Sequence, residues 1–184
     1  MTHEISPLAS GTTMCGPAVT SFGPDLTVRR MAIDLAQPGD VLVVAAGGMV
    51  DRACFGDGTA KRMTMKNMAG AVIDGAVRDA AGLRELGFPT FCRGTTPRNY
   101  HYPAEGEYGA VNVPVVCGGV IVSPGDLILG DDDGVVVVPR DLAPLIQETV
   151  AEKLAAEREL RGSWTEYEPF DVRAELEQRG YVVD

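Results

Sequence analysis

The first half of the chain alternates short apolar runs with stretches in which apolar residues recur at helical spacing. Short apolar runs bounded by turn residues are typical of strands covered on both faces, whereas a spacing of three to four residues favours amphipathic helices. Leu26 to Ala36 has this helical spacing and stops before Pro38-Gly39. The pattern predicts strands at 16–21, 40–46, 71–74 and 89–93, and helices at 26–36, 59–68 and 79–86.

Glycine, proline and aspartate mark the connections between these elements. The segment 47–58 is rich in glycine and is expected to be a loop. The sequences Pro38-Gly39-Asp40 and Pro124-Gly125-Asp126 each introduce an apolar strand. They predict type II turns, because such a turn needs a positive φ that glycine adopts without strain.

The second half of the chain reads as a group of strands followed by one long helix. The pattern predicts strands at 110–117, 119–122, 127–129 and 135–138, then a helix from Leu142 to about Arg161. The helix repeats apolar residues on one side, which we expect to be buried: Leu145, Ile146, Val150, Leu154 and Leu160. Its charged residues, 148–161, are expected to form the solvated side or a subunit contact. The whole pattern favours a layered α/β fold, with residues 1–184 as one domain and a C-terminal helix and tail from about residue 141.

Composition narrows the class of protein. The 184 residues include 45% hydrophobic and 23% charged residues, which suits one globular domain. The net charge of −10 weighs against nucleic acid as a direct partner, and no apolar run is long enough to cross a membrane. The N-terminus has no secretory signal pattern, and the four cysteines are far apart and form no Cys-x-x-Cys pair. We therefore expect reduced thiols and a cytoplasmic protein.

Two segments carry residues suited to chemistry. Phe55-Gly56-Asp57-Gly58-Thr59 lies where a loop enters a helix, so backbone amides there can meet an anion. Asp74 to Asp79 lies where a buried strand ends, which in α/β proteins is where ligand crevices form. Arg78 can bind a carboxylate through two hydrogen bonds, and Asp79 can hold a hard, hydrated cation. Each segment alone also fits an ordinary turn and helix cap. Because the two lie on successive strand–helix connections, together they favour a ligand-binding site.

The motifs in this order resemble the RraA-like family. They are Gly56-Asp57 and the segments 70–79 (GAVIDGAVRD), 93–98 (RGTTPR), 111–119 (VNVPVVCGG) and 124–135 (PGDLILGDDDGV). The resemblance covers roughly Gly16 to Asp141, and the chain end, 180–184 (GYVVD), is similar to tails of the family's aldolases. It implies a three-layer β/β/α sandwich of the swivelling-domain type. It also implies a homotrimer, or a hexamer of two trimers, with Mg²⁺ or Mn²⁺ bound between subunits.

The resemblance implies an activity and a set of site residues. The family's aldolases cleave 4-hydroxy-2-oxo dicarboxylic acids to pyruvate and a second 2-oxo acid, and decarboxylate oxaloacetate. By motif, Asp79 would hold the metal, Arg78 would bind the substrate carboxylate and neutralise the enolate, and Asp57 would orient Arg78 and the waters of the metal. Gly56, Gly58 and Thr59 would complete the substrate site, with the amides of Gly58 and Thr59 meeting the 2-oxo acid. Both reactions leave a pyruvate enolate, so one site serves both.

The chain departs from the aldolases at three places. Gly82 stands where they commonly carry an acidic residue, separated from the Arg-Asp pair by two intervening positions. The chain begins only a short way before Gly16, whereas relatives usually have an additional N-terminal helical segment. The loop Thr95–Glu107, with Arg98, His101 and Tyr102, is distinctive and is expected to set which group lies beyond the 2-oxo acid.

These departures leave two alternatives open. Some relatives are regulators that bind and inhibit an RNA-decay endonuclease without catalysis, and Gly82 favours that class because the regulators also lack the acid. The unusual loop leaves open a lyase for a different 2-oxo or hydroxy acid.

Other reactive residues favour structural interpretations. Asp131-Asp132-Asp133-Gly134 fits a hairpin turn better than a calcium loop, since it lacks EF-hand spacing. Cys54 lacks an obvious histidine partner and is expected to be a packed thiol. His101 is expected to be exposed, although a general acid is the alternative. Lys61-Arg62 does not complete a P-loop.

Overall fold

A computed structural model describes residues 1–23, 25–99, 109–167, 169–170 and 172–182. The chain divides into two compact units, Met1–Ala143 and Pro144–Asp184, and each is described by itself. Within the described residues, no helix is both long and apolar enough to cross a bilayer.

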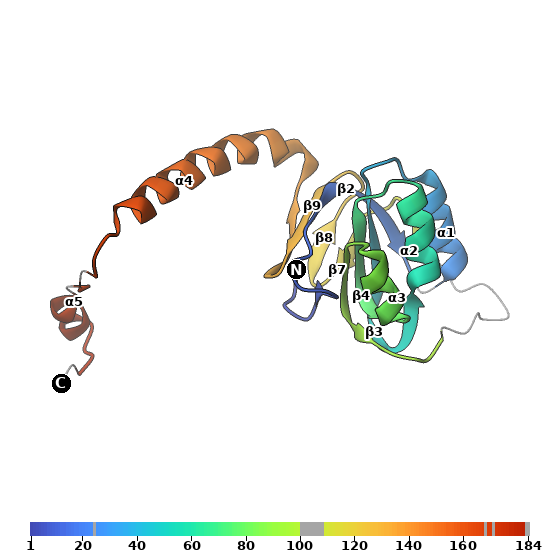
Figure 1. Ribbon diagram of the computed structural model, residues 1–184, viewed down its shortest axis with the longest axis horizontal. Helices are drawn as coiled ribbons and strands as arrows, with labels where there is room; N and C mark the ends of the chain where they lie inside the picture. Colours follow the sequence, from blue (N-terminus) through green and yellow to red (C-terminus); the bar gives the residue numbers. More distant parts are fainter. Residues whose placement is uncertain (24, 100–108, 168, 171, 183–184) are drawn as a thin grey trace. The chain divides into compact units, whose positions relative to one another are not determined.

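The first unit is built on four parallel strands connected by helices. The order is β2 (Met14–Phe22), α1 (Leu26–Leu35), β3 (Val41–Phe55), α2 (Asp57–Met65), β4 (Gly70–Val77), α3 (Ala80–Leu86) and β5 (Thr90–Thr95). Figure 1 shows the three helices together on one side of these strands. The apolar side chains between helices and sheet form one core, which includes Leu42, Ile73, Met63 and Leu83.

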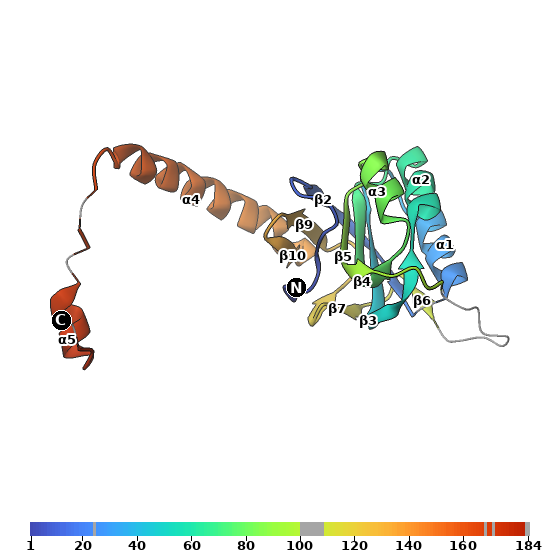
Figure 2. The same cartoon turned by 60° about the horizontal axis from the view of Figure 1, so that its bottom comes forward.

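The other side of the parallel strands is covered by β-structure. Here lie β7 (Val115–Cys117) and β8 (Val120–Val122), which form a hairpin, and β9 (Leu127–Asp131) and β10 (Gly134–Val138), which form a second hairpin. A second core lies on this side of the sheet and includes Val43, Val72, Phe91 and Ile128. Figures 1 and 2 show the resulting order of β-layer, central sheet and helices. The predicted three-layer β/β/α fold is confirmed.

Strand β2 connects the two parts of the main sheet, whose order is β1-β5-β4-β3-β2-β9-β10. Its residues 18–22 pair in parallel with β3, and its residues 14–17 pair antiparallel with β9. The short strand β6 (Ala110–Val111) pairs with its C-terminal end, and β1 (Ser6–Pro7) pairs with the opposite edge of the sheet at β5. β4 therefore lies between β3 and β5 and is buried along its whole length.

Both predicted type II turns are confirmed, and they are closed in the same way. Gly39 and Gly125 have φ of 88° and 86°. The Asp40 carboxylate accepts from the Gln37 amide at 2.7 Å, and the Asp126 carboxylate accepts from the Ser123 amide at 2.8 Å. The turn at Asp131–Gly134 is also confirmed as a hairpin turn, and the Asp132 carboxylate accepts from the Gly11 amide at 2.8 Å.

Three element boundaries were predicted wrongly. The expected loop 47–58 is strand over most of its length, because β3 continues to Phe55 by repeatedly shifting its register against β4. Helix α2 accordingly starts at Asp57 and not at Thr59. The expected strand 110–117 is broken into β6 and β7, with Asn112 between them at a φ of 52°.

The second unit contains helices α4 (Ala143–Ser163) and α5 (Arg173–Gln178), preceded by the 3₁₀ turn η1 (Arg140–Leu142). The long helix was predicted, but its expected buried side is wrong for the single chain: α4 has no buried residue, and Leu145 is 64% exposed. An apolar stripe indicates that this face of the helix favours burial, but it does not identify the partner that buries it. The prediction of one domain over residues 1–184 stays a prediction.

Candidate active site

The two segments singled out in the sequence meet at the C-terminal ends of β3 and β4. The Arg78 amide donates to the Phe55 carbonyl at 2.8 Å, which joins the two strand ends. α2 begins directly after Phe55-Gly56, and α3 begins directly after Asp79. The first turns of the two helices therefore lie side by side, with Asp57 on one and Asp79 at the start of the other.

Each of these aspartates lies against a glycine of the other helix start. A Cβ placed on Gly82 of α3 would lie 2.7 Å from Oδ2 of Asp57. A Cβ placed on Gly56 would lie 2.9 Å from Oδ2 of Asp79. A side chain at either position would make the facing carboxylate move, so glycine allows both carboxylates to approach as closely as they do. Gly82, the position at which the resemblance leads us to expect an acid in the aldolases, is thus in close contact with Asp57.

Asp79 has an unusual backbone conformation. Its φ and ψ of 62° and 40° lie in the left-handed region, and its side chain makes no capping hydrogen bond to α3. A residue other than glycine in this region costs roughly 1–3 kcal/mol and is found mostly where the surroundings or a function require it. Nε of Arg78 lies 3.3 Å from the nearest Asp79 oxygen, and both side chains are about two-fifths exposed, at 41% and 38%. The pair is open to a ligand.

The start of α2 offers backbone donors to the same place. Gly56 caps the helix without a side chain, and the amides of Asp57 and Gly58 precede the first hydrogen bond of the helix, so they point outward. The Thr59 amide is already engaged, since it donates to the Gly56 carbonyl at 3.1 Å. Of the two amides expected to meet the substrate, that of Gly58 is the better placed.

A cavity of about 540 Å³ joins these groups. Its lining includes every residue expected at the site: Gly56, Asp57, Gly58, Thr59, Arg78 and Asp79. It also includes residues that the sequence did not suggest, among them Arg29, Arg30 and Asn99. The helical spacing of α1 could have shown that Arg29 and Arg30 lie near one face of that helix. Nothing in the sequence shows that this face lines the cavity. The roles of all these residues stay predictions.

The donor set suits a hydrated cation. The carboxylates of Asp57 and Asp79 line the same cavity, and the described residues contain no group of three or more His, Cys, Asp or Glu side chains that could hold a metal. A zinc site normally takes three or four protein ligands, whereas Mg²⁺ commonly keeps several waters and one or two carboxylates. Mg²⁺, or the similar Mn²⁺, therefore fits this place.

Cys54 lines the cavity but does not look reactive. It is 3% exposed, and its thiol contacts the Ala76 carbonyl at 3.6 Å. Burial raises the pKa of the Cys54 thiol, although the positive charge of Arg29 opposes that shift. The expected packed thiol is supported, because a thiolate is the nucleophilic form.

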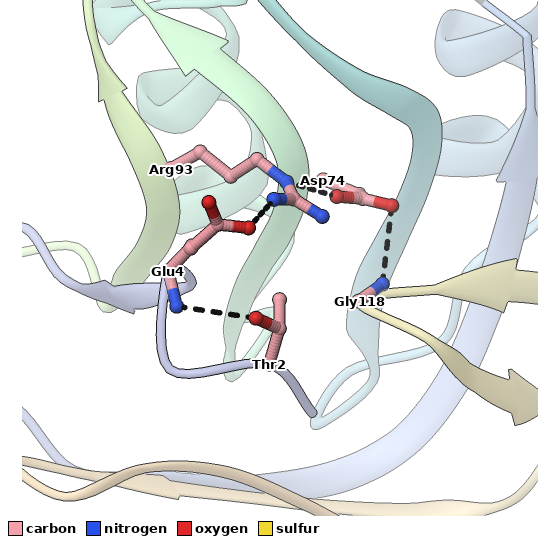
Figure 3. A network of polar contacts seen from close by, with 5 residues as sticks. All are labelled: Thr2, Glu4, Asp74, Arg93 and Gly118. Carbon is pink, nitrogen blue, oxygen red and sulfur yellow. Dashed lines mark hydrogen bonds and ion pairs between the residues drawn. The ribbon is translucent and has the colours of Figure 1, made fainter.

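A second charged cluster lies on the opposite face of β4 and was not predicted. Figure 3 shows Arg93 of β5 between Asp74 and Glu4. Its Nε donates to Asp74 at 2.5 Å, and its Nη1 pairs with Glu4. The other Asp74 oxygen accepts from the Gly118 amide at 3.1 Å. The hydrogen bond from Arg93 to Asp74 raises the pKa of the Arg93 guanidinium.

The distinctive loop Thr95–Glu107 is described only as far as Asn99. His101, Tyr102 and residues 100–108 lie outside the described residues. Arg98 is described, and its carbonyl accepts from the Ala53 amide at 2.9 Å. Asn99, next to it, lines the cavity, which places the start of this loop beside the site.

Fold and site together define an α/β protein with a cavity lined by charged residues at the ends of its parallel strands. The RraA-like (Aldolase/RraA) family model matches residues 1–137, and the chain belongs to this family. A Halalkalibacterium halodurans protein, provisionally named 4-hydroxy-4-methyl-2-oxoglutarate aldolase, is 38% identical over 97% of this chain and 84% of its own length.

Two further relatives extend the comparison. Protein DlpA of Legionella pneumophila is 32% identical over 84% of this chain, which spans 26% of DlpA. The crystal structure of Streptomyces coelicolor RraAS2, described as an unusual member of the RNase ES inhibitor RraA protein family, is 38% identical. It superimposes with a TM-score of 0.75 over 85% of this chain and 81% of its own. The family thus includes proteins named for both an enzymatic and an inhibitory activity.

Proposed function

We propose that this protein is a divalent-metal-dependent lyase that cleaves 4-hydroxy-2-oxo dicarboxylic acids to pyruvate and a second 2-oxo acid, and that also decarboxylates oxaloacetate. One observation carries the proposal: Arg78, Asp57 and Asp79 share one cavity at the paired starts of α2 and α3. The similarity to a relative named as an aldolase supports it.

The chain's own residues suit the charge changes of the reaction. In retro-aldol cleavage the C3–C4 bond breaks, its electron pair forms the pyruvate enolate, and the C4 hydroxyl loses its proton as C4 becomes a carbonyl. Arg78 would bind the C1 carboxylate and stabilise the negative charge that develops on the C2 oxygen. The outward amide of Gly58 would donate to the same end of the substrate. Preorganised donors of this kind are typically worth about 3 kcal/mol each.

Asp57 and Asp79 would have different tasks. Asp79 would hold Mg²⁺ or Mn²⁺, largely through water, with Asp57 orienting those waters and the Arg78 guanidinium. When bound, the cation would act as a Lewis acid toward the oxygens of the 2-oxo acid. A water ordered by Asp57 would take the proton of the C4 hydroxyl and return it to C3.

We also propose that the protein acts as a homotrimer or hexamer in the cytoplasm. The exposed apolar side chains of the second unit support assembly, since Leu145, Leu154 and Trp164 are 64%, 47% and 65% exposed. The four cysteines are free, which supports a reducing compartment. Light scattering after size exclusion would test the assembly.

Pyruvate release measures the proposed reaction directly. Oxaloacetate and 4-hydroxy-4-methyl-2-oxoglutarate would each be incubated with the protein and Mg²⁺ or Mn²⁺, and pyruvate would be followed with lactate dehydrogenase. We expect turnover of both substrates and its loss on addition of chelator. Divalent cations decarboxylate oxaloacetate slowly without protein, so the Arg78→Ala variant serves as the matched background. Absence of turnover on both substrates, or turnover that chelator does not reduce, would overturn the proposal.

A second candidate function is inhibition of an RNA-decay endonuclease. Gly82 favours it, because the family's aldolases commonly carry an acid at this position. The likeness to RraAS2, described as belonging to an RNase inhibitor family, supports it too. Cleavage of a fluorescent RNA by the endonuclease, with and without this protein, would test it. Dose-dependent inhibition that Arg78→Ala leaves unchanged, together with no pyruvate release, would favour the regulator.

A further inference from the structure

The cavity extends well beyond the Arg78 end. A water molecule occupies about 30 Å³ in the liquid, so a cavity of about 540 Å³ holds considerably more than the six heavy atoms of pyruvate. The additional space lies between two helices, because the lining continues along Leu26, Arg29, Arg30 and Ile33 of α1 and along Thr59, Arg62 and Lys66 of α2. Positions three or four apart share one face of a helix, so each helix turns a single face toward this space.

The lining is basic in a chain of opposite charge. It carries five cationic side chains, of Arg29, Arg30, Arg62, Lys66 and Arg78, against three carboxylates, of Asp34, Asp57 and Asp79. The chain as a whole has a net charge of −10. Cations gathered in one concave region raise the local concentration of anions. Clustering cations in one cavity does not improve the solubility of an acidic protein. Binding of an anionic ligand explains the cluster better.

Lys66 holds the two helices together. Its Nζ donates to the carbonyls of Ile33 and Asp34, at 2.8 and 2.6 Å, in the last turn of α1. Carbonyls in the last turn of a helix lack their usual helical partners, and that of Ile33 otherwise accepts, among the described residues, only from the capping amide of Ala36 at 3.3 Å, so Lys66 caps α1 and fixes it beside α2. Lys66 is thus a positioning residue, and its ammonium is already occupied.

Arg30 and Arg62, by contrast, are available. Both line the cavity, and in the described part of the chain neither forms an ion pair. Other arginines do pair, as Arg52 does with Asp51. Arg62 lies five residues after Asp57, and a rise of 1.5 Å per residue places it about 7.5 Å further along the axis of α2. An arginine side chain can reach part of that distance back toward a substrate held at Arg78.

We propose that the space between α1 and α2 is a second anion subsite, in which Arg62, assisted by Arg30, binds the distal carboxylate of a 2-oxo dicarboxylic acid. The proposal rests on the proposed function, since it assumes that the 2-oxo acid end lies at Arg78. The subsite makes this protein selective for dicarboxylates over monocarboxylates. Arg29, which is 1% exposed and lines the same wall, adds a fixed positive charge behind the subsite.

Two ligands that differ in the distal carboxylate test the subsite without turnover. Pyruvate and 2-oxoglutarate are both 2-oxo acids, and only the second has a carboxylate at its far end. Calorimetric titration of the intact protein with each, in the presence of Mg²⁺, gives the ratio of their dissociation constants. We expect tighter binding of 2-oxoglutarate to the unmodified protein, and a loss of about ten- to a hundredfold in its affinity in Arg62→Gln. Pyruvate binding should change less than twofold.

Lys61→Gln is the matched control. It removes one positive charge from the neighbouring exposed position of α2, which does not line the cavity. We expect it to bind both ligands as the unmodified protein does. Equal losses in the two variants would show a diffuse charge effect and overturn the subsite.

The outcomes separate the two proposals. If pyruvate and 2-oxoglutarate bind the unmodified protein equally, and Arg62→Gln changes neither, the subsite is wrong while the 2-oxo acid site stands. If neither ligand binds, both proposals fail together. With 4-hydroxy-4-methyl-2-oxoglutarate as substrate, Arg62→Gln should raise KM by a similar ten- to hundredfold and lower kcat by less than threefold.

Discussion

Asp74 of β4 pairs with Arg93 of β5 on one face of the sheet, and Arg78 and Asp79 form a second pair directly after β4; the two pairs differ in burial and in geometry. Asp74 is 6% exposed in its side chain, and its hydrogen bonds to Arg93 and the Gly118 amide measure 2.5 and 3.1 Å. Asp79 is 38% exposed, lies 3.3 Å from Arg78, and has a left-handed backbone. Figure 3 shows the closed pair with its additional partner Glu4.

The difference supports a structural role for Asp74 and Arg93 and the proposed binding role for Arg78 and Asp79. Asp74 and Arg93 bind one another, and Glu4 and the Gly118 amide bind them as well, so the cluster ties the N-terminal segment, β5 and the β7–β8 turn to β4. Arg78 and Asp79 leave capacity unused beside a cavity, and the strained backbone of Asp79 is the kind of feature that a site retains. Mutations should therefore affect stability at the first pair and activity at the second.

The largest expected effect is on catalysis, in Arg78→Lys. Lysine keeps the charge but loses the planar two-donor geometry, so we expect kcat/KM for pyruvate release to fall about a hundred- to a thousandfold. The half-exposed site should keep the thermal midpoint within about 2 °C. Arg52→Lys is the matched control, because Arg52 is 38% exposed and also pairs with its neighbouring aspartate. A similar loss of activity in both variants would contradict a specific role for Arg78.

Next in size is the loss of stability in Asp74→Ala. Removing the carboxylate leaves Nε of Arg93 and the Gly118 amide without their acceptor, while Glu4 still pairs with Nη1 of Arg93. We therefore expect a loss of about 3 kcal/mol, at the lower end of the cost of breaking a buried pair. Urea unfolding would measure this loss. Asp51→Ala removes an aspartate that is 63% exposed and paired with Arg52, and it should cost less than about 1 kcal/mol. Comparable losses in the two variants would show that burial of the Asp74 cluster contributes little.

A smaller effect is expected in Gly82→Ala, which tests the contact between Asp57 and Gly82. The new Cβ would lie 2.7 Å from Oδ2 of Asp57, so the carboxylate must turn away from its present position. We expect kcat/KM to fall about tenfold, as for the loss of one positioning contact. Stability should be unchanged or slightly higher, since alanine favours helix over glycine by about 1 kcal/mol. Ala81→Ser, an addition of one atom at the exposed preceding position of α3, should leave both quantities unchanged.

The sequence predicts the layers and the two site segments, because these depend on local patterns. Apolar runs fix β4 and β5, and the order of glycine, aspartate and arginine fixes which strand exits carry chemistry. It does not predict that β3 continues through Gly47 and Gly48, since glycine-rich stretches are usually loops and only pairing with β4 makes this one a strand. Nor does it predict the contact of Asp57 with Gly82, which joins two helices through space.

The least predictable feature is the position of Arg93. In the sequence, Arg93 ends a predicted strand and begins the motif 93–98, and nothing there indicates its partners. In the fold its guanidinium lies between Asp74 and Glu4, which are 19 and 89 residues away. Pairs so distant in sequence leave no periodic signal. The cationic wall between α1 and α2 is hidden for the same reason, because Arg30 and Arg62 come together only when the two helices pack side by side.

The smallest expected effect is a contribution of Cys117, which lies beside the Asp74 cluster, to the pH dependence of the free energy of unfolding. It is fully buried beside Asp74, and burial, with the negative charge of Asp74 second, raises the pKa of its thiol to about 12. In the unfolded chain the thiol ionises from about pH 9. Between these values the unfolded state loses a proton that the folded state keeps, so the free energy of unfolding falls as pH rises, by up to about 1.4 kcal/mol per pH unit. In Cys117→Ala the decrease between pH 8 and pH 10, measured by urea unfolding, should be smaller by about 1 kcal/mol. Cys15 is exposed, so Cys15→Ala should have the same pH dependence as the unmodified protein. The same slope in the unmodified protein and in both variants would mean that Cys117 ionises in the folded state.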